Sequence, residues 1–328
     1  MGTLDALRRP VAPLLSEFDD FIDRQFTAEG ELLSEMLRYA LSVRGKGIRP
    51  LLVFLSAALH GGGAERVGRR AHLAAMLVEM IHVASLIHDD VIDGADQRRG
   101  HPSPNALWQS RNAVVLGDYV LARTMQIGLE SDAADLVTHV VRTMGRLCEG
   151  EVLQSDAVRR RMVSRARYFE VIRRKTASLL GVSASVGALA VGAGDEVAAR
   201  MAQFGETLGM AFQIKDDLLD YAEEGSTGKP AHNDLREGKI TLPLLVLLEE
   251  APEERRAGLL ALLDRCASDP EAVARLHDEV VRGGGMEQTE RVMREFADGA
   301  RQLLADFPAS PCRESLEGLC RYVTDRTR

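Results

Sequence analysis

The chain has 328 residues, of which 45% are hydrophobic and 27% charged, as in a globular protein with a large apolar core. Its formal net charge of −8 argues against general binding to nucleic acid, which requires a basic surface. The four cysteines show no paired spacing, so we expect reduced thiols rather than a zinc site or a disulfide framework.

We expect no signal peptide in the first residues, because Asp5, Arg8 and Arg9 interrupt them and no apolar segment follows. The least polar stretch, Ala177–Ala193, is too short for a confident membrane span and is rich in small residues. It predicts close helix packing in a core. We therefore expect a cytoplasmic protein without a membrane span.

Apolar residues recur with helical spacing along almost the whole chain, for example in the stripe from Leu73 to Ala84. Strand signals are scarce, and no Asn-Gly or Asp-Gly hairpin is present. Glycine and proline clusters leave about ten or more helices. One cluster is Gly45–Pro50, where Pro50 suits the first position of the next helix. We predict an all-α fold in a single domain over residues 1–328.

Two aspartate clusters share one spacing, in Asp89–Asp93 and in Asp216–Asp220. Each places carboxylates at i and i+4, which are neighbours on one helix face and repel each other unless cations neutralise them. Mg²⁺ suits this role because it binds a few carboxylates, waters and substrate phosphates. Apolar sequence precedes both clusters, which favours a two-sided metal site in a helical cavity over chance acids on a solvated face.

Lysines and arginines lie near the chain breaks and near the acid clusters. They are Lys46 and Arg49, Arg98 and Arg99, Lys175, and Lys215, Lys229 and Lys239. The segment around Lys46 is not a Walker loop, and by itself it would be explained as an ordinary basic start of a helix. Carboxylates that can bind metal ions, together with cationic side chains that can bind phosphate oxygens, indicate a binding site for a diphosphate.

In this order, the motifs GKGIRP, HVASLIHDDVID followed by RRG, KTA, FQIKDDLLD, GKP and DLREGKITLP resemble the trans-polyprenyl diphosphate synthases, from about Gly45 to Leu245. The resemblance implies the isoprenoid synthase fold, a single bundle of helices around a central cavity with the two motifs facing each other across its mouth. It also implies a homodimer. The implied reaction is Mg²⁺-dependent condensation of an allylic diphosphate with successive isopentenyl diphosphate units.

The resemblance assigns the metal to Asp89, Asp93 and Asp216, which would ligate about three Mg²⁺ ions that bridge the allylic diphosphate. The further or water-mediated ligands would be Asp90, Asp217 and Asp220. The allylic diphosphate would be held by Arg98, Lys175, Thr176, Gln213 and Lys229. The isopentenyl diphosphate, which binds without metal, would be held by Lys46, Arg49, His82 and Arg99. The expected supporting residues are Gln154 and Asp234.

These parts imply a chemistry. Mg²⁺ and the cationic side chains would stabilise the charge on the leaving diphosphate, and apolar walls would keep water from the allylic cation. The released diphosphate is the expected base, since the aspartates are expected on metal. Without the family resemblance, His82 would be interpreted as a satisfied histidine on an apolar helix.

Three alternatives remain at this point. The first is a short-chain farnesyl or geranylgeranyl diphosphate synthase, although bacterial short-chain relatives have an insertion between Asp90 and Asp93 that this chain lacks. A class I terpene cyclase shares the first motif, but it usually has a different second motif and needs no second diphosphate site. A non-catalytic partner subunit of a heteromeric synthase tends to lose motif aspartates, and this chain keeps all six.

The residues before the first motif bear on product length. Ser85 and Ala84, four and five positions before Asp89, lie about 6–7.5 Å away along a helix axis, and both are small. In the family, short-chain enzymes commonly have an aromatic residue at one of these positions. The deeper Ile81 and Met80 are bulky but not aromatic. We predict a long-chain product of about C30 to C50, destined for quinone side chains. Peripheral membrane contact during product release stays open.

Overall fold

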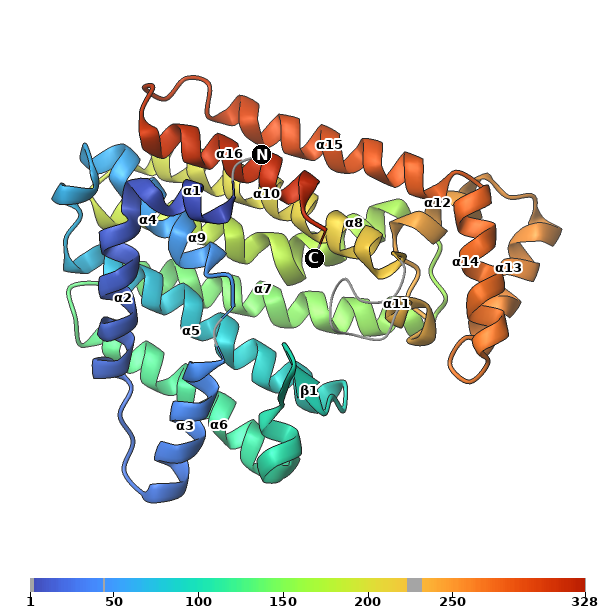
Figure 1. The fold of residues 1–328 in the computed structure, drawn as a ribbon, viewed down its shortest axis with the longest axis horizontal. Helices are drawn as coiled ribbons and strands as arrows, with labels where there is room; N and C mark the ends of the chain where they lie inside the picture. Colours follow the sequence, from blue (N-terminus) through green and yellow to red (C-terminus); the bar gives the residue numbers. More distant parts are fainter. Residues whose placement is uncertain (1–2, 44, 223–231, 328) are drawn as a thin grey trace.

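The computed structural model describes residues 3–43, 45–222 and 232–327, and helices dominate it (Figure 1). The α-helices are α1 (Leu4–Arg8), α2 (Ala12–Gln25), α3 (Glu31–Ser42), α4 (Ile48–Gly61), α5 (Arg69–Ile92), α6 (Pro104–Leu129), α7 (Ala134–Arg159), α8 (Arg165–Ile172), α9 (Ser178–Ala190), α10 (Asp195–Asp220), α11 (Asn233–Arg236), α12 (Leu242–Glu250), α13 (Glu253–Arg265), α14 (Pro270–Arg282), α15 (Gly285–Leu303) and α16 (Pro311–Asp325). The shorter helical turns are η1 (Arg9–Val11), η2 (Ala64–Arg66) and the π-helical turn η3 (Arg173–Ala177). The prediction of an all-α bundle is confirmed.

The segment after the first aspartate cluster contains a short hairpin. Strand β1 (Gln97–Arg98) pairs antiparallel with β2 (His101–Pro102) across the turn Arg99-Gly100. The φ angles of Arg99 and Gly100 are 54° and 77°. Two successive positive φ angles are typical of a tight hairpin turn, and glycine supplies one of them without strain. The turn lacks the Asn-Gly or Asp-Gly signal because arginine occupies its first position.

The segment Gly45–Pro50 forms the start of α4, as expected, but Pro50 is the third helical residue and not the first. Gly47 has a φ of 58° and is the last residue before the helix. The helix therefore begins two residues earlier than it would if Pro50 were its first residue. Proline is tolerated throughout a first helical turn, where amide donors have no intrahelical partner. Arg49 is thereby fixed in the first turn of α4.

Glycines let the helices around the centre of the bundle approach each other closely. A Cβ atom at Gly209 of α10 would lie 2.5 Å from the Cα of Ala177, and one at Gly150 of α7 would lie 2.7 Å from the backbone nitrogen of Lys175. The π-helical turn η3 is therefore held between α7 and α10. The twelve buried residues of α9 confirm the close packing predicted for the small-residue stretch.

The largest apolar cluster extends from Leu7 to Val323, and a smaller one joins the end of α10 to α11–α14. Figure 1 shows α13 and α14 at one end of the molecule. Within the described ranges, α5 is long and apolar enough to cross a membrane, but 67% of its apolar window is buried inside the protein. It has the burial of a core helix. The organisation of residues 1–328 as one domain stays a prediction.

Candidate active site

A cavity of about 720 Å³ lies between the start of α4, α5, α7, α9 and α10. Its walls bring together most of the residues that the sequence selects. They are Lys46, Arg49, His82, Ser85, Asp89, Asp93, Arg98, Arg99, Lys175, Thr176, Gln213, Asp216 and Lys239. The two aspartate clusters therefore face one space, together with cations from four separate segments of the chain.

The other predicted residues lie elsewhere. Asp90 faces a neighbouring cavity of about 370 Å³, whose walls also include α2 and α3. Asp217 and Asp220 face a third cavity of about 380 Å³, which shares Asp216 with the central one. Ala84 is fully buried and is not part of the central lining. Lys229 lies outside the described residues.

Both aspartate clusters lie at the carboxyl end of a helix. Asp89 belongs to the last turn of α5, Asp93 follows that helix, and Asp216–Asp220 ends α10. A helix carries negative partial charge at this end, so carboxylates there are unfavourable without a cation nearby. Burial raises the pKa of Asp89; Lys175 acts in the opposite direction, and Glu151 and Asp93 raise the pKa further. These positions favour cation binding.

Asp90 has a different role from its neighbour. Its carboxylate is 1% exposed and accepts a hydrogen bond of 2.8 Å from Nε of Arg98. Asp90 is neutralised by this ion pair and orients the guanidinium of Arg98, which lines the central cavity. The structure therefore places Asp90 behind Arg98 and away from the face that Asp89 presents to the cavity.

The middle aspartate of the second cluster is also buried and anchored. Asp217 accepts a hydrogen bond of 2.5 Å from the hydroxyl of Tyr168 and one of 2.9 Å from the amide of Gln213. The hydroxyl of Thr176 donates to Gln213 at 2.7 Å, so the four side chains form a continuous chain. Burial and the charge of Asp234 raise the pKa of Asp217 well above its usual range. The sequence patterns give no signal for Tyr168.

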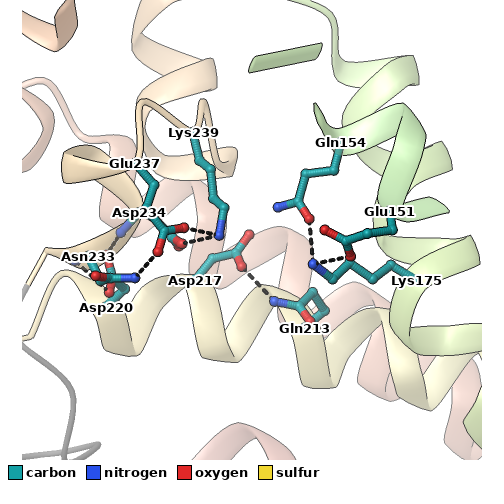
Figure 2. Close-up of polar contacts among 10 residues, drawn as sticks. All are labelled: Glu151, Gln154, Lys175, Gln213, Asp217, Asp220, Asn233, Asp234, Glu237 and Lys239. Carbon is teal, nitrogen blue, oxygen red and sulfur yellow. Dashed lines mark hydrogen bonds and ion pairs between the residues drawn. The ribbon is translucent and has the colours of Figure 1, made fainter. Parts of the chain in front are cut away.

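Asp220 organises the segment that follows. Its carboxylate accepts the backbone amides of Asn233 and Asp234, each at 3.0 Å, and so fixes the start of α11 (Figure 2). Lys239 forms ion pairs with Asp234, at 3.7 Å, and with Glu237. Burial alone would lower the pKa of Lys239, but these two carboxylates hold it above its usual range. Lys239 is therefore a fixed cation on the wall of the central cavity.

Lys175 is held on the opposite wall. Its ammonium lies 2.6 Å from Oε1 of Gln154 and 2.6 Å from Oε2 of Glu151, both on α7. Figure 2 shows Lys175 and Lys239 on either side of Asp217. The supporting role expected of Gln154 agrees with this contact, whereas Glu151 was not selected. Lys215 does not line the cavity and lies near charged residues of α15.

Three cations, Lys46, Arg49 and Arg99, lie with His82 on the α4 side of the cavity. The guanidinium of Arg99 lies against Gly45, where a Cβ atom would collide with it, and donates to the carbonyl of Val43 at 3.1 Å. Burial lowers the pKa of Arg49 to about 10, so it stays charged at neutral pH. Burial and the charge of Arg49 hold the pKa of His82 well below its usual range. His82 is thus a neutral hydrogen-bonding group among cations.

The final helix also reaches this site, which the sequence did not indicate. Arg326, which follows α16, donates to Asp216 at 2.7 Å, and Nζ of Lys46 lies 5.9 Å from the ring centroid of Tyr322 on α16. Residues at the end of the chain therefore contact both the second aspartate cluster and the segment before α4.

Comparison with known proteins identifies this constellation of motifs. Residues 30–280 match the model of the polyprenyl synthetase family. The chain belongs to this family. The predicted membership of the trans-polyprenyl diphosphate synthases, and with it the prediction of a prenyltransferase, is confirmed.

Curated relatives span most of the chain. It is 35% identical to heptaprenyl diphosphate synthase component 2 of Geobacillus stearothermophilus, over 95% of each protein. It is 33% identical to nonaprenyl diphosphate synthase of Mycobacterium tuberculosis, over 95% of this chain and 92% of the relative. A short chain isoprenyl diphosphate synthase of Methanothermobacter thermautotrophicus is also 33% identical, over 99% of each.

Solved structures agree with the fold. Polyprenyl synthase from Caulobacter crescentus, crystallised with calcium and isoprenyl diphosphate, superimposes with a TM-score of 0.91 at 30% identity, covering 100% of this chain and 99% of that one. The isoprenoid synthase fold predicted from the motifs is confirmed.

Proposed function

We propose that this chain uses Mg²⁺ to extend an allylic diphosphate with successive isopentenyl diphosphate units, giving a long-chain all-trans polyprenyl diphosphate of about C30 to C50. The observation that carries the proposal is the central cavity, where Asp89, Asp93 and Asp216 face two groups of cations. The relatives named for heptaprenyl and nonaprenyl products support the long chain. We assign the product to quinone side chains.

The residues fit Mg²⁺ bound together with a substrate. Across residues 3–43, 45–222 and 232–327, no three His, Cys, Asp or Glu side chains form a metal site by themselves. Mg²⁺ commonly takes only one or two carboxylates from the protein and completes its octahedron with water and substrate phosphates. Asp89, Asp93 and Asp216 would hold about three such ions. Bound Mg²⁺ would neutralise the charge that develops on the leaving diphosphate.

The side chains of this protein divide the remaining work. Lys175 and Arg98 bind the allylic diphosphate and place its carbon chain toward the interior of the cavity. Arg49, Arg99 and neutral His82 bind the isopentenyl diphosphate and hold its double bond near the allylic carbon. The apolar wall, which includes Leu147, Leu179, Leu180 and Phe212, excludes water from the allylic cation. We assign the final proton to the released diphosphate.

Two cation groups favour a synthase over a terpene cyclase. A cyclase binds one diphosphate, whereas here the cations near α4 and those near η3 lie on different walls of the same cavity. A non-catalytic partner subunit is disfavoured because every motif aspartate and described motif cation is present.

We propose a homodimer through α6 and α7. Within the described ranges, six of the nine exposed large apolar side chains lie on these two helices. They are Leu107, Val114, Val115, Leu129, Val141 and Val152. Apolar side chains gathered on neighbouring elements are typical of an interface. Light scattering of the purified chain tests this: wild type should have the mass of two copies, and Leu129→Glu combined with Val141→Glu should shift it toward one copy. A monomeric wild type would contradict the proposal.

We further propose a cytoplasmic location, supported by four cysteines that are all free thiols.

The test of the function itself is direct. The purified chain is incubated with farnesyl diphosphate, [¹⁴C]isopentenyl diphosphate and Mg²⁺, and the dephosphorylated products are sized by chromatography. We expect prenyl alcohols of C30 or longer, and no extension with EDTA. A cyclic product, or extension only with a second subunit, would overturn the proposal.

A further inference from the structure

Arg326, the third residue from the end of the chain, is attached to the candidate metal site by several contacts. Its Nη2 atom donates to Oδ1 of Asp216 at 2.7 Å and to the carbonyl of Phe212 at 2.8 Å. The guanidinium carbon lies 4.0 Å from the ring centroid of Phe212. Its side chain is only 6% exposed, although it lies so near the terminus. A side chain held this way is a built part of the site.

The contact does not satisfy every hydrogen-bond donor of the Arg326 guanidinium. Nε of Arg326 is buried and has no hydrogen-bond partner among the described residues. A buried donor without a partner is unfavourable, and arginine can otherwise offer five donors in a planar fork. Within the described ranges, its hydrogen bonds of 2.7 and 2.8 Å both come from Nη2. Arg326 is therefore held firmly by Phe212 and Asp216, but its hydrogen-bonding capacity is not fully used in this position.

Asp216 is the carboxylate that this arginine neutralises. It lies one turn before the carboxyl end of α10 and lines the cavity that also contains Asp89 and Asp93. A cation beside Asp216 offsets the repulsion among these carboxylates and the negative partial charge of the helix end. The guanidinium and a divalent cation would need the same carboxylate for the same electrostatic reason.

We propose that Arg326 is a placeholder cation, which occupies Asp216 when no divalent metal is bound and must release it for metal to bind. This inference rests on the proposed function, because it takes Asp216 as a metal ligand. It adds a positioning residue from the end of the chain, outside the motifs that define the family resemblance.

The test measures metal binding without turnover. Mn²⁺ alone is titrated into the full-length protein, and free Mn²⁺ is followed by electron paramagnetic resonance. Because Arg326 competes for a partly exposed carboxylate, Arg326→Gln should bind Mn²⁺ about three- to tenfold more tightly than wild type. Arg326→Lys, which keeps the charge, should stay near wild type. Arg321→Gln is the matched control, since Arg321 is an exposed arginine on α16.

The gain must depend on Asp216. In the Asp216→Asn background, Arg326→Gln should produce no further change in Mn²⁺ affinity. A chain ending at Asp325 serves as a second way to remove the guanidinium and should match Arg326→Gln. The proposal is overturned if folded Arg326→Gln or the shortened chain binds Mn²⁺ no more tightly than wild type, or if the tightening persists without the Asp216 carboxylate.

A second readout follows the side chain itself. Trypsin can cleave after Arg326 only when that side chain leaves Asp216 and enters the protease, so Mn²⁺ should speed this cleavage in wild type. Intact-mass spectrometry detects it, and an unchanged rate would contradict the inference. Failure here is distinguishable from failure of the proposed function. The same wild-type preparation is assayed for polyprenyl products, and those products would still form if Arg326 were merely structural.

Discussion

Replacing Ser85 by phenylalanine should shorten the product, because Ser85 lines the central cavity on the helix that carries Asp89. Ser85 lies four residues before Asp89, or about 6 Å along the axis of α5. A phenyl ring extends about 5 Å beyond Cβ, which is a large part of the 8–10 Å between the axes of packed helices. The ring would therefore obstruct the passage beside α5.

The expected length follows from this distance. An isoprene unit adds four carbon–carbon bonds to the chain, or about 5 Å when extended. The diphosphate and its cation lie between the Asp89 carboxylate and the first carbon of the product. The carbon chain therefore begins on the far side of Asp89 from Ser85 and runs past Asp89 before it reaches Ser85. This distance, together with the offset from the diphosphate, leaves room for only the first few units, so a ring at Ser85 should stop growth at about C20 or shorter, whereas wild type should reach C30 or more.

The assay is chromatography of radiolabelled prenyl alcohols made by purified variants under equal turnover. Val83→Phe is the matched control, because Val83 is on the same helix but lines the neighbouring cavity. Its product should keep wild-type length. Ala84→Phe should lower the melting temperature, because Ala84 is fully buried outside the lining of the central cavity and overpacking costs about 1–3 kcal/mol. The reasoning is refuted if Ser85→Phe still makes products above C30, or if wild type stops at C20.

Asp89→Ala should lower kcat by orders of magnitude without lowering the melting temperature, because burial already disfavours this carboxylate; activity within tenfold of wild type would contradict its role. Lys46→Ala should raise KM for isopentenyl diphosphate about ten- to hundredfold and Lys175→Ala should do so for the allylic substrate, and steady-state kinetics showing the reverse pattern would refute the division. The pKa of His82 is lowered in the fold, so the unfolded chain protonates first as pH falls below about 6.5 and stability is lost. Thermal melts from pH 7 to 5 should consequently fall less steeply for His82→Gln; parallel curves would exclude His82 as the cause. Tyr168→Phe should reduce activity and raise KM for the allylic substrate while its melting temperature drops, since Asp217 loses a buried hydrogen bond; unchanged kinetics would exclude a positioning role for Tyr168.

The sequence could predict the central constellation because its chemistry is local in sequence. The DDxxD spacing at the ends of α5 and α10 and the glycine-bounded GKGIRP segment are each contiguous, so their residue types and periodicity suffice to propose both diphosphate sites. The small-residue stretch of α9 likewise predicted the close packing of that helix in the core. These features depend on short-range geometry, which helical periodicity specifies.

The contacts that orient the site could not be predicted in this way. Tyr168 reaches Asp217 across 49 positions of sequence, and Arg326 reaches Asp216 across 110. An isolated tyrosine on α8 or an arginine near the chain end has no distinguishing neighbours in sequence. Glu151 was missed for the same reason, although its position one turn before Gln154 and its approach to Lys175 are plain once α7 and η3 are packed together.

The equal spacing of the two aspartate clusters conceals unequal roles, and helix geometry explains part of the difference. Successive residues of an α-helix are about 100° apart, so the second aspartate of each cluster must point away from the first. Asp90 and Asp217 accordingly turn from the central cavity and are anchored by Arg98 and Tyr168.

Asp93 and Asp220, the last aspartates of the two clusters, have different contacts because different segments follow them. Asp93 follows the end of α5 and faces the cavity, whereas Asp220 is still helical and receives the backbone amides that begin α11. A carboxylate committed to two amides has less freedom to bind a cation than one facing solvent. Asp220→Asn should therefore disturb the position of Lys239 and the start of α11 more than metal affinity, while Asp93→Asn should do the opposite. The repeated motif supplies one carboxylate pattern, and the chain that follows each copy decides which of its members face the substrate.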